Sequence, residues 1–151
     1  MSASQTRLTD FLPYLLSITS NAVSDRIADR YRAHFGLKIP EWRVMAVLGD
    51  LGAQTQRALV EATRMDKVAV NRACKMLEER GLLARWPNTA DGRSHHLDLT
   101  GAGHEVYGAI MPIALEMESR MFSALSAQER SLFKDLLQRI RAQAETTGTD
   151  A

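Results

Sequence analysis

The chain has 151 residues, of which 45% are hydrophobic and 25% are charged, and its formal net charge is +1. This length and composition are typical of one domain with enough apolar side chains for a packed core, so we expect a single domain over residues 1–151. The near-zero net charge does not indicate a partner, but the charge is unevenly spread. Lys and Arg outnumber Asp and Glu by three over residues 55–97, and the acids exceed them by three over residues 98–125.

Several classes of protein are disfavoured by the same sequence. No run of about 18 apolar residues occurs, so we expect no membrane-spanning helix and no membrane partner. The first residues lack a basic region followed by an apolar run, which disfavours a secretory signal. One cysteine, Cys74, excludes an intrachain disulfide and a Cys-x-x-Cys metal site. We expect a cytoplasmic protein.

The predicted elements begin with a long helix over residues 8–33. Its apolar residues follow helical spacing over a broad face, and a face this wide usually packs against more than one neighbour. Pro13 lies within the first two turns, so the regular helix is expected to begin near it. Gly36 is expected to end the unit.

Three shorter helices are predicted next, over residues 40–51, 56–63 and 67–80. Pro40 is a favourable first residue for the first of them. Thr55 and Asp66 are expected to cap the second and third helices, because their side-chain oxygens can accept from free backbone N–H groups. Gly81 is expected to end the third helix.

A small β-hairpin is predicted to follow. Its strands are "LLARW" (82–86) and "HHLDL" (95–99), and the polar "NTADGRS" between them contains an Asp-Gly turn signal. Thr100 can then cap a helix that runs to about residue 123, with a kink expected at Pro112. "SAQE" (126–129) is a capping box that opens a last helix over residues 127–144.

The order short helix, turn, helix and hairpin over residues 55–99 has the outline of a winged helix-turn-helix. The helix over 67–80 is predicted to be two-faced, with an apolar stripe formed by Val70, Ala73, Cys74 and Leu77. The opposite face carries Val68, Asn71, Arg72 and Lys75. Asn and Arg can read base edges in the major groove, and Arg64 and Lys67 near the turn can contact phosphates.

The hairpin is interpreted as a wing that reaches an adjacent minor groove, where Arg93 would be inserted behind the Asp91-Gly92 turn. Asp91 is expected to orient this loop, and Ser94 and His95 are expected to join the contacts with DNA. His95 and His96 point to opposite faces of a strand, so they cannot easily share a metal ion. We expect no metal and no cofactor, and Cys74 is interpreted as a buried thiol in preference to a redox switch.

The stretch "MDKVAVNRACKMLEERGLLARWPNTADGRSHHLDLTGAG" resembles the recognition helix and wing of MarR-type bacterial transcription regulators. The matching pieces are "NR…LEERGLL…R", "DGR" and "L-x-LT-x-x-G". The resemblance implies a mainly α fold with a β-hairpin wing, with DNA binding by residues 40–99 and dimerisation by residues 8–36 and 101–146. It further implies a homodimer that binds a pseudo-palindromic operator in double-stranded DNA and is released by a small-molecule effector.

A ligand pocket is one interpretation of the small polar residues in "SITSN" (17–21), and a helix interface that needs small side chains is the other. The pocket hypothesis adds aromatic and polar residues that follow in the chain. The candidate ligand-binding residues are Ser17, Ser20, Asn21, Tyr31, His34, Trp42 and Arg43. By family analogy, the expected effector is an aromatic acid or its coenzyme A thioester.

Two other functions were weighed against a ligand-responsive repressor. A winged-helix architectural or protein-interaction module without a sensor is the main alternative, but the long helices favour the repressor. An enzyme is disfavoured because the sequence has no Gly-rich phosphate loop, nucleophile elbow or His-Glu-x-x-His motif.

Overall fold

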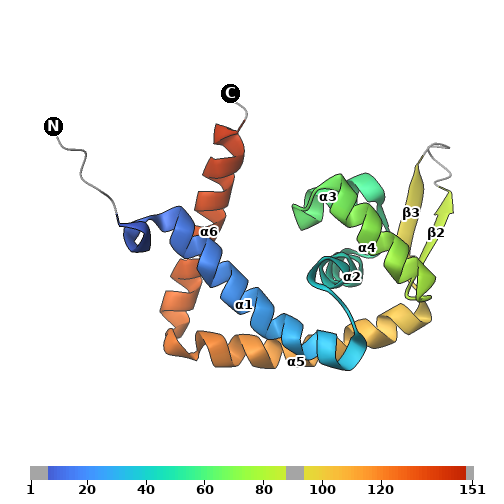
Figure 1. The fold of residues 1–151 in the computed structure, drawn as a ribbon, viewed down its shortest axis with the longest axis horizontal. Coiled ribbons are helices and arrows are strands. Elements are labelled where there is room, and N and C mark those ends of the chain that lie inside the picture. Colours follow the sequence, from blue (N-terminus) through green and yellow to red (C-terminus); the bar gives the residue numbers. More distant parts are fainter. Residues whose placement is uncertain (1–6, 88–93, 149–151) are drawn as a thin grey trace. The chain divides into compact units, whose positions relative to one another are not determined.

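A computed structural model describes residues 7–87 and 94–148 of the chain (Figure 1). Helices make up most of these residues, and the strands form one small sheet. The chain divides into two compact units, Met1–Ala114 and Leu115–Ala151, which are described one after the other. The predicted fold class, mainly α with a β-hairpin wing, is confirmed.

The first unit begins with a single 3-10 turn, η1 (Leu8–Asp10), and the long helix α1 (Leu12–Phe35). The predicted helix over residues 8–33 is therefore interrupted, because the backbone of Phe11 is extended. Pro13 then takes an early helical position, where its missing N–H has no partner to lose. Gly36 ends α1 in the left-handed region at a φ of 65°, which a residue without a Cβ adopts easily.

Three helices follow as predicted: α2 (Ile39–Leu51), α3 (Gln56–Thr63) and α4 (Lys67–Glu79). Both predicted caps of α3 and α4 are confirmed. Thr55 Oγ1 accepts from the backbone N–H of Ala58 at 3.1 Å, and Asp66 Oδ1 accepts from that of Ala69 at 2.8 Å. Glu41 accepts from the backbone N–H of Lys38 at 3.2 Å at the start of α2, which gives this buried carboxylate a partner.

The predicted hairpin is present as β2 (Leu83–Pro87) and β3 (His95–Leu99), which pair antiparallel. We call this hairpin the wing. A third strand, β1 (Gln54–Thr55), pairs with the other edge of β3 and was not predicted. The predicted site residues Asp91 and Arg93 lie outside the described residues.

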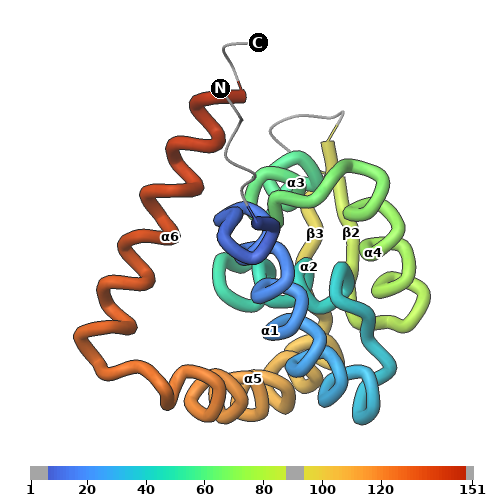
Figure 2. Tube along the Cα trace, turned by 60° about the vertical axis from the view of Figure 1, so that its left-hand side comes forward, coloured from blue at the N-terminus to red at the C-terminus, as the bar shows by residue number. Residues whose placement is uncertain are grey.

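The core of this unit is enclosed by α2, α3, α4 and the inner face of the sheet, and Ala28 and Tyr31 of α1 and Ile110 are also buried in it. Figures 1 and 2 both show α4 alongside β2 and β3. The predicted apolar stripe of α4 is confirmed, because Val70, Ala73, Cys74 and Leu77 are all buried. Burying one stripe of a helix requires its opposite face to point outward. The core therefore determines which residues of α4 are available to a partner.

The helix α5 (Gly101–Met121) begins at a joint with the end of α4. Thr100 Oγ1 accepts from the backbone N–H of Gly103 at 3.1 Å, which confirms the predicted cap, and donates to the carbonyl of Gly81 at 2.6 Å. Gly103 packs directly on the Leu82 carbonyl, and a Cβ there would overlap it. Pro112 lies inside α5, and the kink expected there stays a prediction.

The second unit contains the end of α5, the turn η2 (Phe122–Ala124) and α6 (Ala127–Thr147). The predicted capping box is confirmed: Ser126 Oγ accepts from the backbone N–H of Glu129 at 3.1 Å, and Glu129 accepts from that of Ser126 at 2.9 Å. These hydrogen bonds hold the pKa of Glu129 below its ordinary value. Phe122 packs against Phe133, with their ring centroids 6.0 Å apart. Within the described residues, no helix is long and apolar enough to cross a membrane.

Candidate nucleic-acid interface

The outward face of α4 carries the residues that were predicted to read DNA. Lys67, Val68, Asn71, Arg72 and Lys75 are all exposed, while the residues between them are buried or half-buried. The face is mixed in chemistry, with three cations, one amide and one exposed aliphatic side chain. It presents to solvent the donors and acceptors that a base edge or a phosphate can use.

A cavity of about 960 Å³ is bounded by α3, α4 and the wing. We call it the α3–α4–wing cavity. Five predicted DNA-binding residues line it together, namely Lys67, Asn71, Lys75, Ser94 and His95. The first three come from α4, and the other two come from the start of the returning wing strand. Residues that are up to 28 positions apart in the sequence are thus brought to one concave surface, which supports the predicted site.

Six further residues line this cavity and were missed by sequence reasoning: Thr55, Gln56, Arg57, Val60, Glu78 and Arg85. The first three begin α3, where free backbone N–H groups and the helix dipole favour an anion. The signal that could have found them is the N-cap Thr55, which marks this helix start. Arg85 gives no such signal, because it lies within a strand and only the fold brings it to the cavity.

Positive charge prevails on the lining of the cavity. Among the described residues that line it, four cations face one acid, Glu78, which forms an ion pair with Arg85 at 2.8 Å. Arg57 lies 3.8 Å from Glu61 in an exposed ion pair, and such pairs contribute little to the stability of the fold. Within the described residues, Lys67 and Lys75 form no ion pair. The surface is therefore suited to an anionic partner.

Arg72 and Arg64 lie apart from this cavity. Arg72 lines a second cavity of about 570 Å³ between the start of α2 and α4, together with Lys38, Lys75 and Met76. Arg64 ends α3 in the left-handed region at a φ of 56°, and its guanidinium donates to the carbonyl of Glu61 at 2.9 Å. Both side chains are exposed, so both are accessible to a partner outside the cavities.

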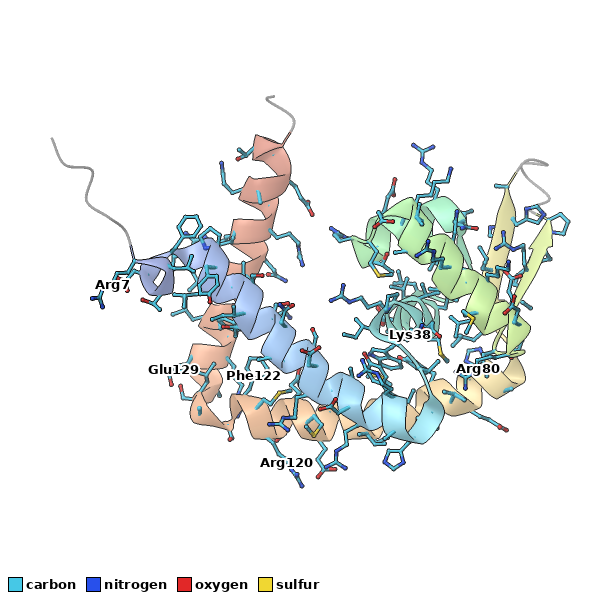
Figure 3. All side chains as sticks on the ribbon, viewed as in Figure 1. Arg7, Lys38, Arg80, Arg120, Phe122 and Glu129 are labelled. Carbon is cyan, nitrogen blue, oxygen red and sulfur yellow. The ribbon has the colours of Figure 1, made fainter. Side chains whose placement is uncertain are left out.

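The far end of α4 is fixed to the turn between α1 and α2. Arg80, labelled in Figure 3, donates to the carbonyl of Phe35 at 2.6 Å and to that of Gly36 at 3.4 Å. These carbonyls end α1 and lack partners within the helix. Arg80 therefore holds α4 in place and does not contribute its charge to the outward face.

The candidate ligand-binding residues are partly brought together. Tyr31 is buried and packs against Trp42 with ring centroids 5.7 Å apart, and Trp42 stacks on Tyr107 at 6.0 Å. We call these three rings the aromatic ladder. Burial raises the pKa of Tyr31 to about 12, against an opposing effect of Arg32 and Arg43. Ser17, Ser20, Asn21, His34 and Arg43 are exposed, and none of the predicted ligand residues lines either cavity described above.

The two histidines of the wing have different surroundings. His95 is exposed at the cavity, whereas His96 is half-buried and lies opposite Trp86, with ring centroids 6.4 Å apart. Among the described residues, no group of three His, Cys, Asp or Glu side chains is placed to hold a metal ion. The histidines are therefore surface and packing residues in this geometry.

Comparisons with known proteins agree with this geometry. A family model described as "MarR family" matches residues 35–94. The transcriptional regulator HosA of Escherichia coli is 32% identical over 101 residues, which cover 67% of this chain and 75% of HosA.

Two solved structures share the fold at lower identity. A mutant of MarR from E. coli complexed with operator DNA has a TM-score of 0.77 at 19% identity, over 85% of this chain and 92% of that one. NadR in complex with 4-hydroxyphenylacetate has a TM-score of 0.77 at 20% identity, over 93% and 96% of the two chains.

Proposed function

This chain belongs to the MarR family of transcriptional regulators, and we propose that it is a homodimeric repressor whose operator is released by a small aromatic acid or its coenzyme A thioester. The observation that carries the DNA-binding part is the α3–α4–wing cavity, where cations and an amide from three elements converge.

The recognition helix in this proposal is α4. Asn71 reads a base edge in the major groove, and Arg72 does so from the adjoining face of the helix. Lys67, Lys75 and Arg64 contact phosphates, and the free N–H groups at the start of α3 add a further phosphate contact beside Gln56 and Arg57. The wing, with Ser94 and His95 at its described edge, contacts the neighbouring part of the duplex.

A homodimer is favoured by apolar side chains that remain exposed at both ends of the chain. On η1 and α1 these are Leu8, Phe11, Leu12, Leu16 and Ile18, and on α6 they are Leu132, Phe133, Leu136 and Ile140. Apolar surface of this extent usually marks an association site. Two-fold pairing would place two α4 helices about 34 Å apart, as a pseudo-palindromic operator requires.

The effector is proposed to bind beside the aromatic ladder. The stacked rings of Trp42 and Tyr107 suit an aromatic ligand, and the exposed guanidinium of Arg43, whose charge lowers the pKa of Tyr31, can receive a carboxylate. NadR, which shares this fold, was solved with an aromatic acid. In this proposal, Ser17, Ser20, Asn21 and His34 supply polar contacts to the effector.

DNA binding is tested by selecting duplexes from a random library with the wild-type protein and measuring affinity by fluorescence anisotropy. Asn71→Ala is expected to cost about 1–3 kcal/mol on the selected duplex and to relax the preference at one base pair. Lys67→Ala is the matched comparison. It is expected to weaken binding to all sequences alike and to lower the salt slope by about 1. Failure of the wild-type protein to enrich any sequence would contradict a sequence-specific regulator.

The effector is tested by adding aromatic acids and their thioesters to the complex of protein and selected duplex. An active compound is expected to release the DNA and to raise the melting temperature of the free protein. Arg43→Ala is expected to weaken this response to a free acid without changing DNA affinity, and Arg43→Lys is expected to preserve part of it. If no compound stabilises the protein while DNA binding is intact, an architectural winged-helix module without a sensor becomes the better description.

A further inference from the structure

At the base of the wing, one arginine joins three elements. Arg85 of β2 donates from Nε and from one terminal nitrogen to Glu78 Oε1 of α4, at 2.9 and 2.8 Å. Its other terminal nitrogen donates to Gln56 Oε1 at the start of α3, at 3.2 Å. The contacted residues are 7 and 29 positions away in the sequence.

The position of Arg85 in the strand explains how it reaches both helices. Side chains alternate along a strand, so Arg85 lies on the same face as Leu83, which is buried against the core. In the sheet register Arg85 lies opposite Leu97, which is fully buried. Arg85 is therefore the residue at which the inner face of β2 leaves the core, and its charge emerges between α3 and α4.

The ion pair is neither exposed nor fully buried. The side chains of Arg85 and Glu78 are 33% and 32% exposed. Beyond Leu83 the remaining residues of β2 are exposed, so this strand supplies no further buried side chain that fixes the angle of the wing. Directional, charge-assisted hydrogen bonds at this point are suited to that task.

We propose that Arg85 and Glu78 position the wing against the recognition helix, so that both can contact DNA at once, with Gln56 joining α3 to the same pair. Arg85 is a positioning residue in this inference, and its charge is used by Glu78 and not by a phosphate. The inference rests on the proposed DNA-binding function and deepens it.

The positioning role and simple electrostatics predict opposite effects of removing Glu78 on the affinity for DNA. Glu78 lines the DNA-facing cavity as its one acid, so a purely electrostatic view expects its removal to strengthen binding. If Glu78 positions Arg85 and the wing, its removal weakens binding instead. The sign of the effect of Glu78→Gln therefore separates the two roles.

The experiment measures anisotropy on the wild-type-selected duplex over a range of salt concentrations, together with the melting temperature of each variant. Glu78→Gln and Arg85→Lys are each expected to lower affinity at least about fivefold with a salt slope like that of the wild type. The double variant Glu78→Gln/Arg85→Gln is expected to be no weaker than Arg85→Gln alone, because coupled residues are not additive. Glu61→Gln is the control, since it removes an exposed acid of α3 that pairs with Arg57. This variant is expected to leave the affinity for DNA unchanged or higher.

Several outcomes would overturn the inference. Unchanged or tighter binding by Glu78→Gln, additive losses in the double variant, or a salt slope reduced by about 1 in Arg85→Gln would each assign Arg85 to a phosphate contact or to no role. Where Arg85→Gln does not fold, the sign for Glu78→Gln and the loss in Arg85→Lys decide the matter. If the wild-type protein selects no DNA, the proposed function fails; if it binds and the variants behave like it, this inference alone fails.

Discussion

At the scale of single residues, helix α4 gives neighbouring positions opposite roles. Asn71 and Arg72 are exposed, whereas Ala73 and Cys74, which follow directly, are buried in the core. The thiol of Cys74 is fully buried, and this desolvation raises its pKa from 9.0 to about 11. Arg85 lowers this pKa and Glu78 raises it, but both effects are smaller than that of burial. Cys74 is therefore a core residue whose thiolate is disfavoured.

The raised pKa predicts a loss of stability in alkaline solution. The folded state holds the Cys74 proton more tightly than the unfolded chain, so this contribution is present in full below pH 9 and is lost as the pH rises toward 11. A shift of this size corresponds to about 2–3 kcal/mol. Urea unfolding at several pH values from 8 to 11 measures it. Tyr31, with its pKa raised to about 12, adds a second loss that begins near pH 10.

Cys74→Ala serves as the comparison for this prediction. It lowers stability below pH 9 because it leaves a small cavity, but it removes the thiol titration. The decline between pH 9 and 10 is therefore expected to be shallower in the variant. Parallel curves for the two proteins would show that Cys74 does not cause the decline.

The outward-facing residues of α4 were predictable because a helix has one period and its apolar stripe identifies the opposite face. Lys67, Asn71 and Lys75 were found in this way, and the structure brings them to one cavity. Gln56 and Arg85 were not found, since their position depends on how α3, α4 and the wing pack together. Asp91 and Arg93 were predicted from a loop motif that lies outside the described residues, so their roles stay predictions.

At the scale of elements, the joint between α4, β2 and α5 depends on close backbone contact. Thr100 bridges the Gly81 carbonyl and the first turn of α5, and its own N–H donates to Leu82 at 3.1 Å. Gly103 lies against that same Leu82 carbonyl with no room for a Cβ. In the sequence pattern Leu-Thr-x-x-Gly, Thr100 therefore caps α5 and Gly103 allows the close packing on Leu82.

Gly103→Ala is expected to destabilise the protein by about 1–3 kcal/mol, because the added methyl group must displace a backbone carbonyl. Gly101→Ala is the matched control in the same helical turn, where a Cβ would meet nothing within 4 Å. It is expected to be neutral or to stabilise by up to about 1 kcal/mol. Thermal or urea unfolding of both variants measures the difference. Equal free energies of unfolding for the two variants would show that the joint accommodates the added methyl group without loss of stability.

Helices, their caps and the β2–β3 hairpin were predictable at this scale, whereas the pairing of β1 was not. As caps, Thr55, Asp66, Thr100 and Ser126 each accept from an N–H three residues later, so the local sequence contains the capping signal. The strand β1 has only two residues, which is too short to show an alternating pattern. It exists because the returning strand β3 offers a free edge to Gln54 and Thr55, more than 40 residues earlier. The start of the regular helix was predictable from Pro13, since α1 begins at Leu12, directly before it.

At the scale of the whole molecule, apolar side chains that no described residue covers argue for a second copy of the chain. Leu12 at the start of α1 is 74% exposed, and Leu136 of α6 is 39% exposed in a row of similar residues. A monomer would leave these apolar faces exposed to solvent, whereas two-fold pairing would bury them and present two recognition helices to one operator. In the proposed dimer, the apolar faces therefore determine the affinity for a two-site operator, because they hold two recognition helices in one molecule.

Leu12→Glu is expected to shift the protein toward monomer, because the dimer interface would have to bury a carboxylate without a partner. Affinity for a full palindrome is expected to fall at least about tenfold, since binding of the second half-site is no longer intramolecular. Affinity for a single half-site is expected to stay the same. Leu51→Glu is the control, as Leu51 is 58% exposed at the end of α2 outside the proposed interface, and it is expected to remain a dimer. Analytical ultracentrifugation and anisotropy on the two duplexes measure both properties. A Leu12→Glu protein that stays dimeric would place the interface elsewhere, and a monomer that still binds the palindrome tightly would separate dimerisation from operator recognition.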